Sequence, residues 1–238
     1  IWYFNYNNYI KQHYAVINKE LEKEKFDLII FRYPLANRFL YKLTKKYKGK
    51  IIFEHNTKEL EEIAANGIFN KETRLIFNYE NIYGPKALFN SKAIIGVTNE
   101  ITTYEVKRSG KELKSLTVTN GIEAKNIPVR NAPLYSGKEL RLLMLCGSAV
   151  SWHGEDLIIK AIAEYKGNVN ILFYVVGDVL ESSKKMAKEL KIEHKIKFLP
   201  PLKDNKLTDL FNEVHLGIGT LALFSKGLNE AVPLKVRE

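Results

Sequence analysis

The chain has a single cysteine, Cys146, among its 238 residues. One thiol excludes a framework of disulfides, and its place in an apolar run suggests a reducing compartment. No apolar stretch reaches the ~18 residues that would cross a membrane. The first residues lack the basic start and apolar core of a signal peptide. These absences together predict a cytoplasmic protein.

Several sequence motifs of metal and nucleotide chemistry are also missing. The chain has no His-Glu-x-x-His, Cys-x-x-Cys or Asp-x-Asp motif, so neither a structural zinc site nor a divalent-metal sugar site is predicted. It has no Gly-x-x-x-x-Gly-Lys loop, which argues against a P-loop ATPase. Its basic residues are not interleaved with aromatic residues in a recognisable module, so no nucleic acid is predicted as a partner.

Positive charge, in contrast, is abundant. Lys and Arg number 37 against 27 Asp and Glu, which gives a formal net charge of +10 and a pI near 9.4. Such a surface suits nucleic acid, anionic lipid or a phosphorylated substrate. A solvated, lysine-rich surface explains the same excess.

Short apolar runs alternate with amphipathic stretches along the first half of the chain. Runs too short for helices lie at 26–31, 50–54, 93–98 and 115–119, and helical spacing covers 35–48, 59–65, 71–90 and 100–108. The helical stretch 71–90 is interrupted at Gly84-Pro85. Buried strands that alternate with helices predict a parallel sheet covered on both faces.

A stretch rich in turn residues, 120–138, then breaks the pattern and predicts a linker. The alternation restarts after it, with strands at 141–146, 170–176, 195–199 and 214–219 and helices at 155–165, 182–190 and 204–213. A chain of 238 residues is long enough for two domains. We expect an acceptor-side domain at 1–122, a linker at 123–139 and a nucleotide-binding domain at 140–238, with a cleft between two Rossmann-like sheets.

Two carboxylates, Glu230 and Glu238, lie eight positions apart on either side of Pro233. Proline is favoured in the first turn of a helix, so a helix is predicted to begin at Pro233, with Glu230 on the loop before it and Glu238 inside it. A loop, a helix N-terminus and carboxylates suit a phosphorylated sugar or a nucleotide. The spacing alone also fits a surface helix with scattered glutamates.

Four segments, taken in order, resemble a known family. They are Val118-Thr-Asn-Gly-Ile122, Cys146-Gly-Ser-Ala-Val-Ser-Trp-His-Gly-Glu-Asp-Leu-Ile158, Val175-Val-Gly-Asp178 and Asn229-Glu-Ala-Val-Pro-Leu-Lys-Val-Arg-Glu238. Together they resemble the family 4 type of retaining glycosyltransferases, and the terminal pair matches that family's Glu-x7-Glu motif. The resemblance implies the GT-B fold: two Rossmann-like α/β domains that face each other across a cleft. The form Trp152-His-Gly154 is similar to a subset that acts in cell-surface polysaccharide assembly.

The resemblance also implies roles for individual residues. Glu230 would face the transferred sugar, Glu238 would bind the ribose of the donor, and His55, which follows a strand, would contact the acceptor or the donor sugar. A lone histidine after a strand is also commonly structural. The remaining donor-binding residues implied are Gly147, Ser148, His153, Gly177, Leu199, Asn229, Leu234 and Lys235.

One departure from the family pattern concerns the leaving diphosphate. Many members have an Arg after the first glycine and a Lys before the second, whereas this chain has Ser148 and His153. His153 could donate to a phosphate oxygen in place of the lysine. Lys235 or Lys226 could also bind the diphosphate, and Lys235, which lies in the matching Pro-Leu-Lys, is the better candidate, although a solvated lysine is nearly as good an interpretation.

The expected activity is therefore retaining transfer of a sugar from a nucleotide-diphosphate sugar to a glycan or lipid-linked acceptor. The family implies a front-face mechanism without a metal or other cofactor. The basic surface predicts an enzyme that is peripheral on the anionic inner face of a membrane. Two alternatives stay open: a non-catalytic sugar- or anion-binding module, and a sugar-nucleotide epimerase.

The two ends of the sequence predict an internal piece of a longer protein with both domains incomplete. The chain opens on a Tyr- and Asn-rich helical stretch rather than on a strand with a glycine-rich turn. It stops at Glu238, inside a predicted helix. The missing parts would contribute contacts to the donor and the acceptor.

Overall fold

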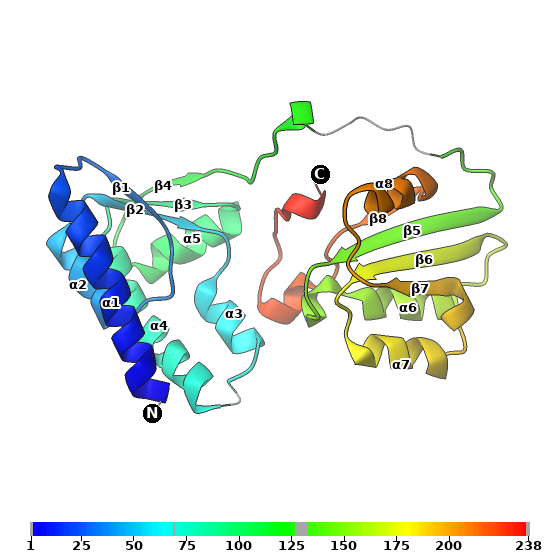
Figure 1. The fold of residues 1–238 in the computed structure, drawn as a ribbon, viewed down its shortest axis with the longest axis horizontal. Coiled ribbons are helices and arrows are strands. Elements are labelled where there is room, and N and C mark those ends of the chain that lie inside the picture. The colour runs from blue at the N-terminus through cyan, green and yellow to red at the C-terminus, as the bar shows by residue number, and fades with distance from the viewer. Residues whose placement is uncertain (1, 69, 127–132, 237–238) are drawn as a thin grey trace. The chain divides into compact units, whose positions relative to one another are not determined.

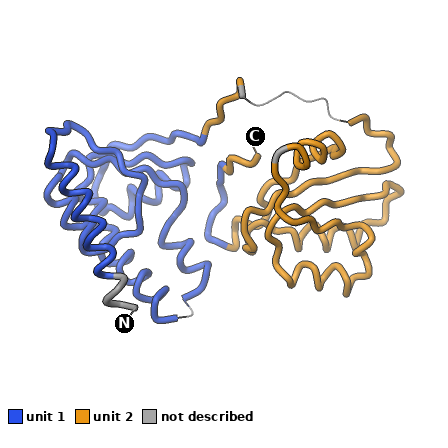
Figure 2. The backbone as a smooth tube through the Cα atoms, viewed as in Figure 1, with its two compact units in different colours: residues 1–120, 226–232 blue, residues 121–225, 233–238 orange. Residues whose placement is uncertain are grey.

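A computed structural model describes residues 2–68, 70–126 and 133–236 of the chain. The chain forms two compact units, one of residues 1–120 with 226–232 and the other of residues 121–225 with 233–238 (Figure 2). Each unit contains a four-stranded parallel sheet and its helices (Figure 1). The predicted α/β class is confirmed. The return of 226–232 to the first unit was not part of the prediction.

The sheet of the first unit has the strand order β1-β2-β3-β4, so each helical connection moves the chain one strand along. Its strands are β1 (Ile29–Arg32), β2 (Ile51–His55), β3 (Ala93–Gly96) and β4 (Lys114–Thr117). Its helices are α1 (Trp2–Lys23), α2 (Arg38–Lys46), α3 (Glu59–Ala65), α4 (Lys71–Asn90) and α5 (Asn99–Arg108). Helix α2 begins at Arg38 because the side chain of Asn37 accepts hydrogen bonds from the N–H groups of Phe39 and Leu40.

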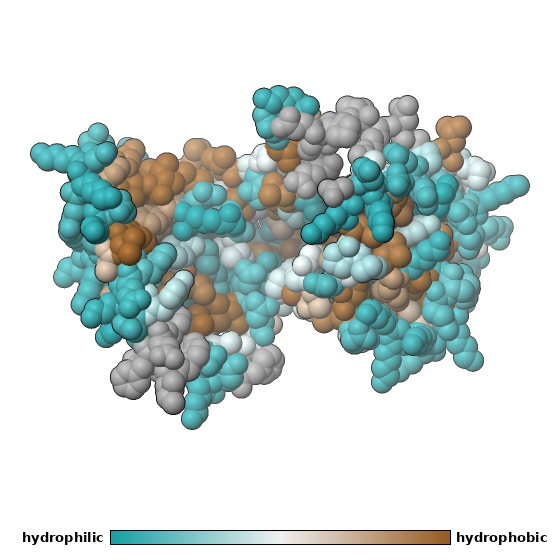
Figure 3. All heavy atoms as spheres, in the orientation of Figure 1, coloured by the Kyte–Doolittle hydropathy of each residue, from teal (hydrophilic) through white to brown (hydrophobic). Residues whose placement is uncertain are grey.

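The core of the first unit lies on one face of this sheet. Phe53 and Ile94 from the strands pack with Leu40 of α2 and Leu88 of α4, and all four side chains are fully buried. The other face is partly open, because Ile30 and Leu116 are 64% and 60% exposed. Figure 3 shows apolar residues gathered over β1 and β4. The prediction of a sheet covered on both faces is therefore wrong for this unit as the structure describes it.

Helix α4 corrects another expectation, because it runs without a break through Gly84 and Pro85. Gly84 leaves room for a buried ion pair, since a Cβ there would lie 1.9 Å from Nη2 of Arg108 and 2.7 Å from Oε1 of Glu80. The packing of α4 against α2, α3 and α5 outweighs the local preference of proline to end a helix.

The sheet of the second unit has the strand order β7-β6-β5-β8. Its strands are β5 (Glu139–Cys146), β6 (Asn170–Gly177), β7 (Ile196–Leu199) and β8 (Leu216–Ile218), and its helices are α6 (Glu155–Glu164), α7 (Glu181–Glu189) and α8 (Asp204–Glu213). Short 3₁₀ turns lie at Ala124–Asn126, Ser151–His153, Glu193–Lys195 and Leu234–Val236, and Leu223–Lys226 forms another where the chain passes between the units.

Alternate side chains of the central strand β5 enter two different cores. Leu142 and Met144 pack in the core that contains Ile159 of α6 and Ala187 of α7. Leu143 packs in the core that contains Leu210 of α8. This period of two explains the continuous apolar run of the sequence, because a central parallel strand is buried on both faces.

The helix predicted to begin at Pro233 is a single 3₁₀ turn, Leu234–Val236, closed by a hydrogen bond from Val236 N to Pro233 O. Glu238, which was predicted to lie inside that helix, falls outside the described residues. Residues 127–132 of the predicted linker also fall outside them.

Candidate functional site

The carboxyl ends of three strands in the second unit meet at one edge of its sheet. Cys146 at the end of β5 is the register partner of Gly177 at the end of β6, and Leu199 at the end of β7 pairs with Val176. Predicted donor residues Gly147, Gly177 and Leu199 therefore lie along this edge. Open α/β sheets bind their ligands at such an edge.

Gly177 is required by the backbone at this edge. Its φ is +113°, which side chains of L-residues rarely adopt. A Cβ there would lie 1.9 Å from the carbonyl oxygen of Cys146. The N–H of Asp178 donates to the same oxygen at 3.0 Å. The glycine thus lets the end of β6 approach the end of β5.

The loop that follows β5 carries Gly147, Ser148 and His153. Gly147 and Ser148 are exposed, and a Cβ at Gly147 would meet open space. His153 ends the 3₁₀ turn Ser151–His153, and its carbonyl accepts a hydrogen bond from the N–H of Leu221. Its side chain is buried, with 6% exposed, which leaves a bound phosphate little access to the ring in this conformation. Contact of His153 with a phosphate stays a prediction.

Lys235 lies beside a small cavity at the edge formed by β5 and β8. Its Nζ donates to the carbonyl oxygen of Leu145 at 2.7 Å. Burial lowers the pKa of Lys235, against the opposite influence of Cys146 and Glu155. The neighbouring Leu234 is exposed. The cavity has a volume of about 110 Å³ and is lined by Leu143, Leu145, Phe211, Gly217, Ile218, Gly219, Lys235 and Val236.

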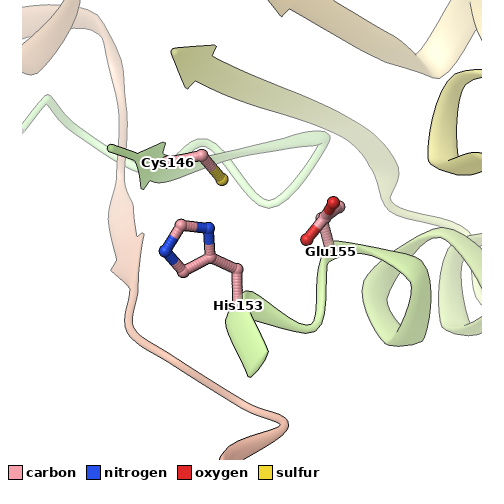
Figure 4. Close-up of side chains that lie close together, drawn as sticks. All are labelled: Cys146, His153 and Glu155. Atoms are coloured by element: carbon pink, nitrogen blue, oxygen red, sulfur yellow. The ribbon is translucent and has the colours of Figure 1, made fainter. Parts of the chain in front are cut away.

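Three buried side chains that sequence reasoning did not group lie close together in the second unit. They are Cys146, His153 and Glu155, the first residue of α6 (Figure 4). Their sulfur, nitrogen and oxygen atoms lie within 4.8 Å of one another. Burial raises the pKa of the Cys146 thiol to about 11, with Glu155 adding to the shift and Lys235 opposing it. The only signal in the sequence is the pair His153-x-Glu155, which is too short to be specific.

Asn229 and Glu230 belong to the first unit, where Glu100 at the start of α5 holds them. The N–H groups of Asn229 and Glu230 donate to Oε2 of Glu100 at 2.9 and 2.8 Å. In return, Oε2 of Glu230 accepts from the N–H of Glu100 at 3.2 Å. The Glu230 carboxylate thus lies at the N-terminus of α5, where the helix dipole favours negative charge.

Further contacts fasten the rest of the segment 226–232 to the first unit. Lys58 donates to the carbonyl oxygen of Gly227 at 3.0 Å and forms an ion pair with Glu100 at 2.6 Å. Partial burial would raise the pKa of Glu100, but the hydrogen bonds from Lys58, Asn229 and Glu230 outweigh it and hold that pKa below its usual value. The amide of Asn120 donates to the carbonyl oxygen of Val232 at 2.8 Å. Sequence reasoning missed Lys58 and Glu100.

His55, the last residue of β2, has no exposed surface. Its ring stacks on Tyr33 with centroids 4.2 Å apart, and its Nδ1 lies 3.0 Å from Oε2 of Glu59. Burial lowers the pKa of His55 to about 4, so the ring is neutral at pH 7. Because the ring is enclosed, any influence on a bound sugar has to pass through its neighbours in this conformation.

The surroundings of His55 are a buried cluster of charged groups. Burial raises the pKa of Glu59 to about 8 and that of Glu105 to about 7. Arg108 forms ion pairs with Glu80 and Glu105, and Tyr33 donates to Glu80 at 2.9 Å. The guanidinium supplies positive charge for the carboxylates of Glu80 and Glu105, while Nε2 of His55 is buried without a hydrogen-bond partner among the described residues.

A larger groove lies on the first unit between α2 and α4. Its volume is about 440 Å³, and it is lined by Tyr41, Lys45, Lys48, Pro85, Lys86, Phe89, Asn90 and Ser109. It combines aromatic side chains with three lysines. Over the stretches that the structure describes, no helix combines the length and apolar character needed to cross a membrane.

No known protein-family model matches the chain, and no curated protein matches it in sequence. Solved structures do match it. The lipopolysaccharide outer core galactosyltransferase WaaB in its apo form is 16% identical, with a TM-score of 0.56 over 86% of this chain and 52% of that one. WaaG, a glycosyltransferase involved in lipopolysaccharide biosynthesis, is 17% identical, with a TM-score of 0.55 over 88% and 57%.

A glycosyltransferase from Rickettsia africae ESF-5 is 16% identical, with a TM-score of 0.52 over 87% of this chain and 55% of that one. The chain thus spans about half the length of these structures. At such identity the likeness concerns the fold: the chain has the GT-B fold of these glycosyltransferases.

Proposed function

We propose that the chain carries the donor-binding framework of a retaining glycosyltransferase. It transfers a sugar from a nucleotide-diphosphate sugar to a glycan or lipid-linked acceptor, in the assembly of a surface polysaccharide. The observation that carries the proposal is the gathering of Gly147, Gly177, Leu199 and Lys235 at or beside one edge of the second sheet. The GT-B fold and the names of the similar WaaB and WaaG support it.

The second unit binds the nucleotide diphosphate in this proposal. The base lies by Leu199, which ends β7, and main-chain groups of that strand end recognise it. Gly147 and Ser148 offer an exposed loop without bulky side chains, which lets phosphate oxygens approach the backbone. Lys235 supplies a positive charge for the leaving diphosphate. Glu238 binds the ribose, as the resemblance implies.

Glu230 and Asn229 act on the sugar in this proposal. The Glu230 carboxylate supports positive charge that develops at the anomeric carbon, and the departing phosphate takes the proton of the acceptor hydroxyl. Fixed charges are effective in transfer reactions because they are in place before the charge develops. Glu100 positions both residues through their backbone N–H groups. His55, enclosed with Glu59 and Glu105, makes no direct contact with the sugar and supports the end of β2.

Incubation with UDP-, GDP- and ADP-sugars labelled in the sugar tests this activity. A transferase releases the labelled sugar slowly by hydrolysis and transfers it faster when a glycan acceptor is added, with the anomeric configuration retained in the product. Glu230→Gln should reduce this rate by about 100-fold or more. The control Glu213→Gln, at an exposed position of α8, should not. Interconversion of two sugar nucleotides would instead identify an epimerase, and no reaction with preserved binding would identify a binding module.

An anionic membrane surface is the partner proposed for the groove between α2 and α4. Lys45, Lys48 and Lys86 can meet lipid phosphates while Tyr41 and Phe89 enter the interface. Co-sedimentation with vesicles that contain anionic lipid, at low salt, tests this. Replacement of the three lysines by Gln should abolish binding, whereas the same change at Lys184, Lys185 and Lys188 of α7 should leave most of it. Equal loss in both variants would contradict a role for the groove.

A further inference from the structure

Three side chains with different donor atoms converge at the start of α6. Cys146 comes from the end of β5, His153 from the 3₁₀ turn, and Glu155 from the first position of the helix, so three separate elements position them. Their exposed fractions are 3%, 6% and 2%. Figure 4 shows the three side chains close together, with one nitrogen of the imidazole turned toward the sulfur of Cys146.

Glu155 gives an independent indication that this cluster binds a ligand. Its Oε1 accepts a hydrogen bond from Oγ of Ser183 at 3.0 Å, which fixes the carboxylate. Its Oε2 is buried and has no hydrogen-bond partner among the residues that the structure describes. A buried carboxylate oxygen without a partner is costly, and such oxygens usually bind a cation or a water molecule.

We propose that Cys146, His153 and Glu155 form a binding site for a thiophilic divalent cation, and that Zn²⁺ is the cation it takes. A thiolate, a neutral imidazole and a carboxylate are the three kinds of side chain that bind zinc. The thiolate and the carboxylate together carry the two negative charges that balance the ion. Oxygen-preferring cations such as Mg²⁺ do not select a thiolate.

The geometry needs only a small closure of the three side chains. The donor atoms lie within 4.8 Å of one another. Zinc in tetrahedral coordination needs such atoms about 3.4–3.6 Å apart, given its usual bond lengths. A shift of roughly 1 Å reaches that spacing, which is within the range of side-chain rotation. The hydroxyl of Ser183 already fixes the carboxylate of Glu155 by a hydrogen bond, and the ligands of zinc sites are usually held by such bonds.

Zinc binding at this site replaces the thiol proton of Cys146 with the metal ion and changes no oxidation state. The S–H bond of Cys146 breaks, its proton passes to solvent, and a Zn–S bond forms. His153 and Glu155 each donate an electron pair, and a solvent molecule fills the fourth position. The proton release makes binding weaker at lower pH.

The cluster around His55 provides a contrast within the same chain. His55, Glu59 and Glu105 also lie within 4.8 Å of one another. There, however, the guanidinium of Arg108 pairs with Glu105 at 3.2 Å and takes the place of a cation. Near Cys146 the nearby cation is Lys235, which donates to a backbone carbonyl rather than to Glu155. We therefore assign the metal site to the second unit.

Cobalt(II) is the probe of choice, because a thiolate ligand gives it a charge-transfer absorption in the near ultraviolet and tetrahedral geometry gives it intense visible bands. The chain has one cysteine, so such a charge-transfer band can come only from Cys146. We expect one equivalent of Co²⁺ to produce both signals and one equivalent of Zn²⁺, but not excess Mg²⁺, to remove them. The experiment needs no sugar nucleotide, so its outcome is separate from that of the proposed transferase activity.

Matched variants identify the other ligands. Glu155→Gln, which keeps the size of the side chain, and His153→Ala should each weaken Co²⁺ binding by about tenfold or more. His194→Ala, at an exposed histidine of the second unit, should not. Circular dichroism of each variant establishes that it is folded. Absence of the charge-transfer band in the unmodified chain, or equal affinity in His153→Ala and His194→Ala, would overturn the assignment.

Discussion

Proton binding by buried side chains makes the first unit sensitive to pH. Burial raises the pKa of Glu59 from 4.5 to about 8 and that of Glu105 to about 7. Between pH 4.5 and about 8 the folded state therefore binds more protons than the unfolded state. The stability that these groups contribute is complete below pH 4.5 and is lost as the pH rises through 7 and 8. His55, whose pKa burial lowers to about 4, acts in the opposite sense and loses its contribution as the pH falls from 6.5 to 4.

The variant Glu59→Gln removes one of these titrating groups and keeps its size. Between pH 6.5 and 8.5 its free energy of unfolding should fall less than that of the unmodified chain, by about 1 kcal/mol or more, because one pKa unit corresponds to 1.36 kcal/mol. Urea denaturation at several pH values measures the difference. Glu213→Gln should follow the unmodified chain. Parallel pH profiles for Glu59→Gln and the unmodified chain would contradict this account of Glu59.

At Gly84, replacing a helical glycine by alanine should change stability in the direction opposite to the usual one. Alanine normally stabilises such a position by about 0.5–1 kcal/mol. Here the new methyl group would collide with the buried pair of Arg108 and Glu80. Gly84→Ala should therefore destabilise the chain by about 2–4 kcal/mol. In the same helix Asn78→Ala, at an exposed position, should be neutral or slightly stabilising, and thermal unfolding compares the two. A stabilised Gly84→Ala would show that the pair is not held against this glycine.

At the scale of elements, the segment 226–232 depends on the first turn of α5. Glu100 accepts hydrogen bonds from two backbone N–H groups of this segment and from Lys58. Lys58, Asn120 and the ion pair of Lys226 with Glu62 add contacts along the segment, and Leu228 is buried. Glu100 is the residue that makes the most hydrogen bonds to the segment.

Loss of that carboxylate should release the segment. Glu100→Ala is expected to lower the free energy of unfolding by about 1–3 kcal/mol, because hydrogen bonds to a charged group are lost. Hydrogen exchange should speed up in peptides that contain residues 226–232. Glu181→Ala, another glutamate in the first turn of a helix, should change neither property. Unchanged exchange at 226–232 in Glu100→Ala would mean that other contacts hold the segment.

The elements of the fold could be predicted largely from the sequence, whereas the sites could be predicted only in part. The run 141–146 and the run 170–176 are continuous and apolar, so their identity as buried strands follows from local pattern alone. The break predicted at Gly84-Pro85 was wrong because α4 packs against α2, α3 and α5, and this packing has no local signature in the sequence. Long-range hydrogen bonds bring Glu100 to Glu230, and no local pattern encodes a contact 130 residues apart.

The same distinction applies to the predicted donor residues. The strand that ends at Gly177 could be predicted from the local pattern, whereas the donor-binding role of Gly177 was implied by the resemblance of Val175-Val-Gly-Asp178 to the family. The burial of His153 beside Cys146 and Glu155 depends on how the 3₁₀ turn packs against residues 221 and 222, far along the chain. Glu238 and the segment 127–132 lie outside the described residues, so their predicted roles stay predictions.

At the scale of the whole molecule, the central claim is that the second unit binds a nucleoside diphosphate. The measurement that tests it most directly is a thermal-shift panel of UDP, GDP and ADP on the chain, on Lys235→Ala and on the control Lys206→Ala. A ligand at 100 times its Kd adds about 2.7 kcal/mol, which corresponds to a shift of a few degrees. We predict a shift by one nucleotide that Lys206→Ala keeps and Lys235→Ala loses. No shift by any nucleotide, or an equal shift in both variants, would contradict the account.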